Sequence, residues 1–131
     1  MSKHLLQVLI LAAGSDGEIQ KEELAIIHKY KEHYPSLKSL PPIEYDTQIA
    51  GVFNKIKAGM SPEYLIDDIG KNIDDSEKAT AYALAYEICA SNFTIVPPEN
   101  DLLDLIKQKW KINNEDHNAI LRSINIRYKI T

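Results

Sequence analysis

The chain has 131 residues, of which 44% are hydrophobic and 26% charged, so it is long and apolar enough to bury one core. This balance is typical of a globular domain and excludes an intrinsically disordered chain. The net charge of −4 and the pI near 5.5 argue against a dedicated nucleic-acid binder, because such proteins neutralise phosphates with a basic stripe. The single Cys89 cannot form an internal disulfide, so we expect a cytoplasmic location.

The first segment has some features of a signal peptide: one lysine, a short apolar run and small residues. Gln7 interrupts that run, and the segment forms part of an internal repeat. We therefore expect it to be a helix of the folded domain. No segment approaches the length needed to span a bilayer. Residues 1–131 are expected to form one domain.

Apolar residues recur at helical spacing along nearly the whole chain and predict about seven helices. The prolines and serines of residues 35–42 predict the longest loop. Only residues 94–96 look strand-like, and this run is too short for a sheet. The sequence predicts an all-α fold, a single compact bundle. Its helices are expected near residues 3–13, 21–33, 44–57, 62–73, 75–91, 97–110 and 114–128.

Several helix starts carry recognisable signals. Ser61 is a typical cap, and the following proline and glutamate suit the first helical turn. Asp74 and Glu77 have capping-box spacing, and Asn113 precedes the last helix as a cap. The helix over residues 75–91 is rich in alanine, which lets neighbouring helices approach closely. We therefore expect it to be central.

The chain contains an internal repeat, in which residues 13–23 align without gaps on residues 89–99. An apolar, helix-like run precedes each copy and another follows it. The sequence therefore predicts two helix–turn–helix units related by an approximate two-fold axis. The matched pairs are Ser15 and Ser91, Asp16 and Asn92, Ile19 and Ile95, and Glu23 and Glu99.

Turn and helix-start chemistry explains each matched residue. Asp16 and the glycine after it are a turn signal, because aspartate bonds nearby amides and glycine tolerates positive φ. Ile19 and Ile95 are expected to be buried as staples between the two helices of each unit. Glu23 and Glu99 fall at the third helical position, where a carboxylate accepts hydrogen bonds from free backbone amides.

The same turn is also a candidate cation site. Asp16, Glu18 and Glu23 place three carboxylates around one turn, and hard cations take oxygen ligands. The spacing is not that of an EF-hand loop, and calcium prefers six to eight oxygens. The second copy has Asn92 and Thr94 where the first has Asp16 and Glu18. We favour the capping interpretation and keep a divalent-cation site as the alternative.

A family resemblance rests on residues 12–23, which read AAGSDGEIQKEE. This segment resembles the small-small-x-x-Asp-Gly-x-Ile-x-x-x-Glu signature of TerB-like domains, and the two-copy layout extends over nearly the whole chain. The resemblance implies a compact helical bundle of about seven helices, a non-enzymatic role, and association with stress or metal response of the tellurite-resistance type. It also implies an acidic cluster that binds metal ions or partners, here Asp16, Glu18 and Glu23, with Glu99 as the acidic match in the second copy.

Other candidate chemistry is sparse. His28 and Glu32 have the i, i+4 spacing of a metal-binding pair, but such pairs are commonly exposed polar neighbours. Cys89 is expected to be a buried, inert thiol. Tyr82, Tyr86 and Trp110 could line a groove, although core packing explains aromatic residues at helical spacing more simply; His4, His33 and His117 are expected on the surface.

Two functional hypotheses follow, from different classes. The first is a non-enzymatic binding or scaffold module that acts through its surface on a protein partner or a divalent cation. The alternative is a small-molecule sensor or small enzyme that uses a pocket between helices. A pocket lined by tyrosine or histidine, with a carboxylate whose pKa is strongly perturbed, would favour the alternative.

Overall fold

The structure, a computed structural model, describes residues 2–15, 19–91 and 94–129. These residues form eight helical segments and no strand, which confirms the predicted all-α fold. No helix in this part of the chain is both long enough and apolar enough to cross a membrane. The segments are α1 (Ser2–Ala13), α2 (Lys21–His33), α3 (Pro35–Lys38), α4 (Pro42–Lys57), α5 (Pro62–Asn72), α6 (Asp75–Ala90), α7 (Pro97–Lys109) and α8 (Asn114–Tyr128).

The extra element is α3, which occupies the first half of the predicted loop at residues 35–42. That prediction is wrong for this half. Pro35 stands at the first helical position, where its fixed φ suits a helix and its missing N–H costs nothing. Leu37 is fully buried and anchors the turn to the core. The prolines therefore start helical segments here and do not mark a continuous loop.

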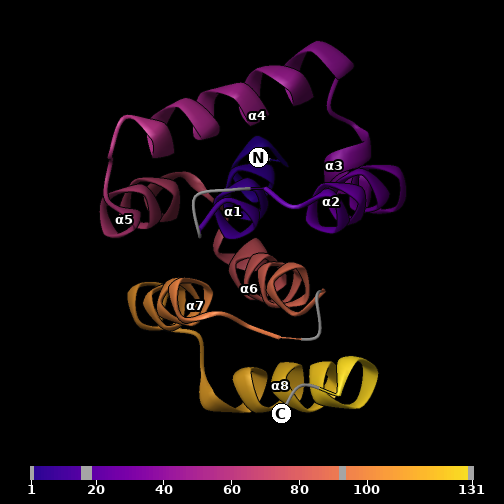
Figure 1. The fold of residues 1–131 in the computed structure, drawn as a ribbon, viewed down its shortest axis with the longest axis vertical. Coiled ribbons are helices and arrows are strands. Elements are labelled where there is room, and N and C mark those ends of the chain that lie inside the picture. Colours follow the sequence, from indigo (N-terminus) through magenta and orange to yellow (C-terminus); the bar gives the residue numbers. More distant parts are fainter. Residues whose placement is uncertain (1, 16–18, 92–93, 130–131) are drawn as a thin grey trace.

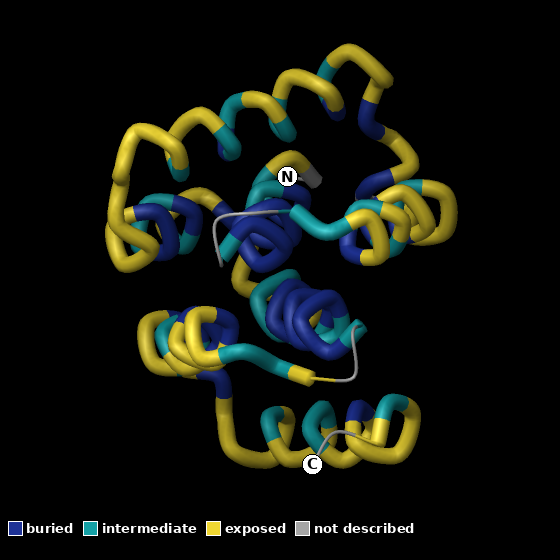
Figure 2. The backbone as a smooth tube through the Cα atoms, viewed as in Figure 1, coloured by how far each residue is buried: buried dark blue, intermediate teal, exposed yellow. Residues whose placement is uncertain are grey.

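Helices α1 and α6 form the centre of the molecule. Nearly every residue from Leu5 to Ala13 is buried, as expected for a helix that is apolar on all sides. The alanine-rich α6 buries Ala81 and Ala85, and it packs directly on α1. Figure 2 shows these two helices as the most deeply buried part of the tube. The prediction that the alanine-rich helix is central is confirmed, and α1 shares that position.

The other helices surround this pair with an approximate two-fold arrangement. Helices α2 and α4 pack on α1, while α7 and α8 pack on α6. In Figure 1, α4 lies above α1 and α8 below α6, with α2 and α7 on opposite sides. A half-turn in the plane of the view therefore relates α1, α2 and α4 to α6, α7 and α8. Helix α5 has no counterpart, and it packs on α1 and α7.

The two copies also share local geometry where the first helix of each unit ends. The hydroxyl of Ser15 donates to the carbonyl of Ala12 at 3.0 Å, and that of Ser91 donates to the carbonyl of Ile88 at 2.7 Å. These bonds join equivalent positions of the alignment. The sequence repeat is therefore a repeat of backbone conformation up to the turn.

The expected burial of the two isoleucines is wrong in degree. Ile19 and Ile95 are only partly buried, and both pack against the core. Each precedes the cap of the following helix, so one side of the side chain meets the core while the other faces solvent. Their environments match between the copies, as the repeat predicts.

Candidate functional site

The acidic turn is only partly within the described residues, because Asp16 and Glu18 lie outside them. Glu23 is described and is 1% exposed. Its Oε1 accepts a hydrogen bond from the backbone N–H of Gln20 at 2.8 Å. Among the described residues, no group of three His, Cys, Asp or Glu side chains could hold a metal ion. Glu23 is thus placed as a helix cap. A cation bound at the turn would have to share the Glu23 carboxylate with the backbone N–H of Gln20.

Glu99 repeats this arrangement in the second unit. It is 4% exposed, and its Oε1 accepts from the backbone N–H of Val96 at 3.0 Å. A valine side chain cannot donate or accept a hydrogen bond, so the glutamate supplies the side-chain half of this cap alone. The predicted capping role of both glutamates is confirmed, and both are more deeply buried than an exposed helix start would require.

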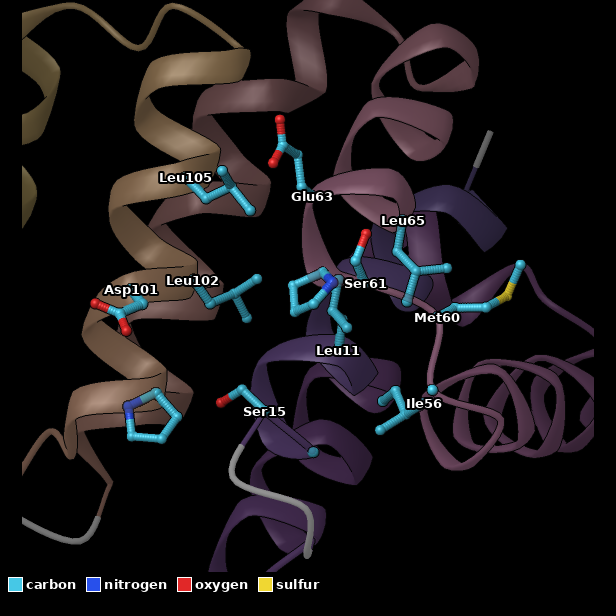
Figure 3. Close-up of a pocket in the computed structure, with 14 residues that line it drawn as sticks. Leu11, Ser15, Ile56, Met60, Ser61, Glu63, Leu65, Asp101, Leu102 and Leu105 are labelled. Carbon is cyan, nitrogen blue, oxygen red and sulfur yellow. The ribbon is translucent and has the colours of Figure 1, made fainter.

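A larger feature of the surface is an open apolar groove between α1, α5 and α7, with a volume of about 630 Å³ (Figure 3). Its first wall is the end of α1, and its second is the corner where α4 passes into α5. The third wall is the first half of α7. The lining residues are Leu11, Gly14, Ser15, Ile56, Gly59, Met60, Ser61, Pro62, Glu63, Leu65, Pro98, Asp101, Leu102 and Leu105.

Local sequence explains the corner between α4 and α5. Gly59 has φ +83°, a conformation that favours glycine and ends α4. The N–H of Met60 then bonds back to the carbonyl of Lys55 at 3.2 Å, which closes the helix end. Ser61 begins α5, and its Oγ accepts from the N–H of Tyr64 at 3.1 Å, as predicted for a cap. The chain thus turns sharply and leaves Met60 partly exposed on the rim of the groove.

The groove is apolar in its depth and acidic at its edge. Leu11, Leu65 and Leu102 are buried residues that form its deeper walls. Its charged lining residues are Glu63 and Asp101, and Glu63 forms an ion pair with a lysine of α7 at 3.0 Å. Within residues 2–15, 19–91 and 94–129, no histidine, tyrosine or cysteine lines it. This surface is suited to holding an apolar group beside a cationic one.

The aromatic residues considered as groove-lining are mostly in the core. Tyr82 and Tyr86 are buried and meet edge to face, with ring centroids 5.8 Å apart. The Tyr82 hydroxyl shares a hydrogen bond with Nδ1 of His117 at 2.8 Å. Trp110 is 7% exposed and donates from its indole N–H to the carbonyl of Ile66 at 3.1 Å. The simpler interpretation, core packing, is confirmed for Tyr82 and Tyr86, whereas Trp110 is buried and also lines a small cavity.

The His28 and Glu32 pair stays on the surface of α2, where both residues are exposed. His28 Nδ1 hydrogen-bonds with the hydroxyl of Tyr45 at 2.9 Å. Burial, together with the charge of Asp46, raises the pKa of Tyr45 to about 12. Cys89 is 1% exposed, which confirms its predicted burial. No metal-binding cluster includes the histidine in the described part of the chain.

Sequence reasoning missed a polar cluster around Glu87 on α6. Its carboxylate accepts hydrogen bonds from Tyr30 of α2 and from Arg127 and Tyr128 of α8. Burial by itself would raise the pKa of Glu87, but these three hydrogen bonds outweigh it and lower the pKa below its ordinary value. The residues are far apart in sequence, so no local pattern could have revealed the cluster.

Comparison with known proteins adds no relative: no family model, curated protein or solved structure matches this chain. The TerB-like resemblance therefore rests on the motif around Asp16 and its second copy.

Proposed function

We propose that this chain is a non-enzymatic binding module of the TerB-like type, and that its groove receives an amphipathic, basic helix of a protein partner. The observation that carries the proposal is the open apolar groove whose charged lining residues are both carboxylates. Peptide helices bind other proteins by laying an apolar face into such a groove. The exposed Met60 adds a flexible, polarisable side chain of the kind that adapts to varied partner helices.

The repeat alignment, extended upstream, places Leu11 on Glu87. The C-terminal end of α8 contacts Glu87 through Arg127 and Tyr128, and α4, the counterpart of α8, packs on α1 in the first unit. Leu11 and Ile56 of α4 both line the groove. A partner helix in the groove would therefore meet leucine and isoleucine, so its contact residue would be apolar.

The TerB-like motif supports a role in stress or metal response, including the tellurite type. In this proposal Asp16 and Glu18 of the acidic turn are a second contact for the partner, because Glu23 is buried as a helix cap and a divalent cation would need its carboxylate. The groove begins one residue before that turn, at Ser15. The residues that follow Ser15 in the sequence therefore add negative charge that would suit a basic partner helix.

The cavity volume favours one alternative, a small-molecule sensor. About 630 Å³ lies within the range of small-ligand sites, roughly 300–1,000 Å³. Such a ligand would need an apolar body to match the leucine-lined walls and a cationic group to match Glu63 and Asp101. The described lining residues include no tyrosine or histidine, so the polar side chains open to such a ligand are the carboxylates Glu63 and Asp101 and the hydroxyls Ser15 and Ser61.

The two occupants can be separated with defined probes. We would titrate the protein with a fluorescent helical peptide of leucines and lysines, and with a matched peptide that carries glutamates in place of the lysines. The basic peptide is expected to bind, and Met60→Lys should weaken binding about tenfold, which is about 1.4 kcal/mol. Asp101→Asn should also weaken it, because the groove loses one of its two carboxylates.

The matched control is Ile43→Lys, which adds the same charge at a residue that is 78% exposed on α4 and outside the groove lining. It should leave peptide binding unchanged. Equal binding of both peptides, or equal weakening by both lysine variants, would contradict the proposal. Saturable binding of a small apolar amine, with no binding of either peptide, would instead support the sensor.

A further inference from the structure

A second cavity lies along the C-terminal half of α5 and has the opposite charge character. Its volume is about 280 Å³, and Gly70 and Trp110 form part of its lining. Lysines from three helices border it: Lys71 of α5, Lys78 of α6 and Lys109 of α7. The chain as a whole has a net charge of −4, so this grouping of cations is not a consequence of overall composition.

Two of these lysines are positioned by their surroundings. The side chains of Lys78 and Lys109 are only 23% and 32% exposed. The ammonium of Lys78 forms an ion pair with Asp75 at 2.8 Å, and the Asp75 side chain is 94% exposed. Ion pairs with such exposed partners contribute little, roughly 0–1 kcal/mol. An anion entering the cavity could therefore replace an exposed carboxylate at small cost.

Lys109 has two acidic partners, Glu63 at 3.0 Å and Asp67 at 3.5 Å. Both carboxylates are well exposed, at 63% and 45%. Asp67 also lines the cavity, so it would repel an anion unless Lys109 continues to neutralise it. Lys71 is exposed and forms no ion pair with another described residue, which leaves one ammonium available for a ligand. An anion that binds here must compete with these carboxylates for Lys78 and Lys109, so an anion with more than one negative charge is favoured.

We propose that this cavity binds a small phosphate-bearing molecule through Lys71, Lys78 and Lys109. Lysine ammonium groups bind phosphate as point charges, and three of them on separate helices can surround one phosphoryl group. The cavity is separate from the apolar groove, because the two share no lining residue. The one ion pair that joins the two linings is that of Lys109 with Glu63, among the described residues.

Trp110 is the single tryptophan of the chain and lines this cavity, so its fluorescence reports binding directly. We would titrate inorganic phosphate, pyrophosphate and glycerol phosphate at constant ionic strength, with chloride as the reference anion. A saturable change is expected, with pyrophosphate tighter than chloride. Lys71→Ala and Lys78→Ala should each weaken binding several-fold, because each removes one ammonium from the site.

The matched control is Lys107→Ala on the same helix as Lys109. Its ammonium donates to Asn114 at 3.1 Å and does not line the cavity. Binding should be unchanged in this variant. Glycerol phosphate binding more tightly than inorganic phosphate would identify a phosphate monoester as the source. No saturable response at about 10 mM, or equal loss in Lys107→Ala, would overturn the proposal.

Discussion

At the residue scale, the two buried glutamates explain why the repeat retains a carboxylate at the same position twice. Glu23 and Glu99 each bond the backbone N–H of the residue before their helix, and both are nearly fully buried. The two N–H groups belong to the partly buried Gln20 and Val96, and loss of such a cap bond costs about 0.5–2 kcal/mol. The carboxylates therefore hold the entry of α2 and α7 into the core.

The burial of Glu23 predicts that Glu23→Ala loses more stability than Ile19→Ala. A staple alone would predict the reverse order. Glu23→Ala should cost about 1–3 kcal/mol, since it empties a buried site and removes the acceptor of the partly buried N–H of Gln20. Ile19→Ala should cost about 1–2 kcal/mol, because Ile19 is only partly buried and loses less contact area. Urea unfolding of both variants measures the order, with Glu23→Gln as the control that keeps an acceptor oxygen. A larger loss in Ile19→Ala would contradict the capping role.

At the element scale, α8 depends on polar anchors to an unusual extent. Ile124 is its one buried residue, and its C-terminal end is joined to α6 by the bonds of Arg127 and Tyr128 to Glu87. The same carboxylate accepts from Tyr30, so one side chain links α2, α6 and α8. The attachment of α8 should therefore respond to the ionisation of Glu87.

The pKa of Glu87 is lowered in the folded protein, and this sets the direction of a pH effect. The stability that Glu87 contributes is fully present above its unfolded-state pKa, about 4.5, and is lost as pH falls through the lower folded-state pKa. Glu87→Gln should be less stable than the parent at pH 7, and the difference should shrink towards pH 3. Urea midpoints between pH 3 and 8 measure it, and a constant difference would argue against the effect.

The contact between α5 and α7 provides a second prediction at this scale. A Cβ added at Gly70 would lie 2.5 Å from Nε1 of Trp110 and 3.0 Å from its Cδ1. Gly70→Ala should therefore displace the indole from the carbonyl of Ile66 and cost about 1–3 kcal/mol, as overpacking does. Thermal unfolding and tryptophan fluorescence would both report the change.

Gly51 offers a matched control, because it lies inside α4 and a Cβ there meets nothing within 4 Å. Gly51→Ala should stabilise the protein by about 0.5–1 kcal/mol through the higher helix propensity of alanine. If both variants lose the same stability, the close approach of Gly70 and Trp110 is not the cause.

At the scale of the whole molecule, α5 breaks the two-fold arrangement of the other helices. It stands between the two units in sequence and has no counterpart in the second. Both the apolar groove and the lysine-lined cavity include residues of α5. The duplicated units thus provide the core, while the unpaired helix creates the two concave surfaces that we propose to be binding sites.

Cation binding at the acidic turn is testable on the whole molecule, because an ion that binds only the folded state raises the melting temperature with concentration. Calcium, magnesium, manganese and zinc should each be titrated to millimolar levels. If the turn binds an ion, Asp16→Asn should abolish the shift and leave the metal-free melting temperature nearly unchanged. Since Glu23 is already a buried cap, we expect no saturable shift.

The sequence alone predicted seven of the eight described helical segments, the repeat and the caps at Ser61 and Asn113, but it missed α3, and Asp74 makes no side-chain cap bond. Apolar spacing and neighbouring residues such as Ser61 act over a few positions, so they specify local structure wherever the helix lies. The tertiary structure decided the rest. Leu11, Leu65 and Leu102 become one groove, and Glu87 meets two tyrosines and an arginine, only because helices distant in sequence pack together. Helix packing depends on the shapes of whole faces, which a local pattern does not contain.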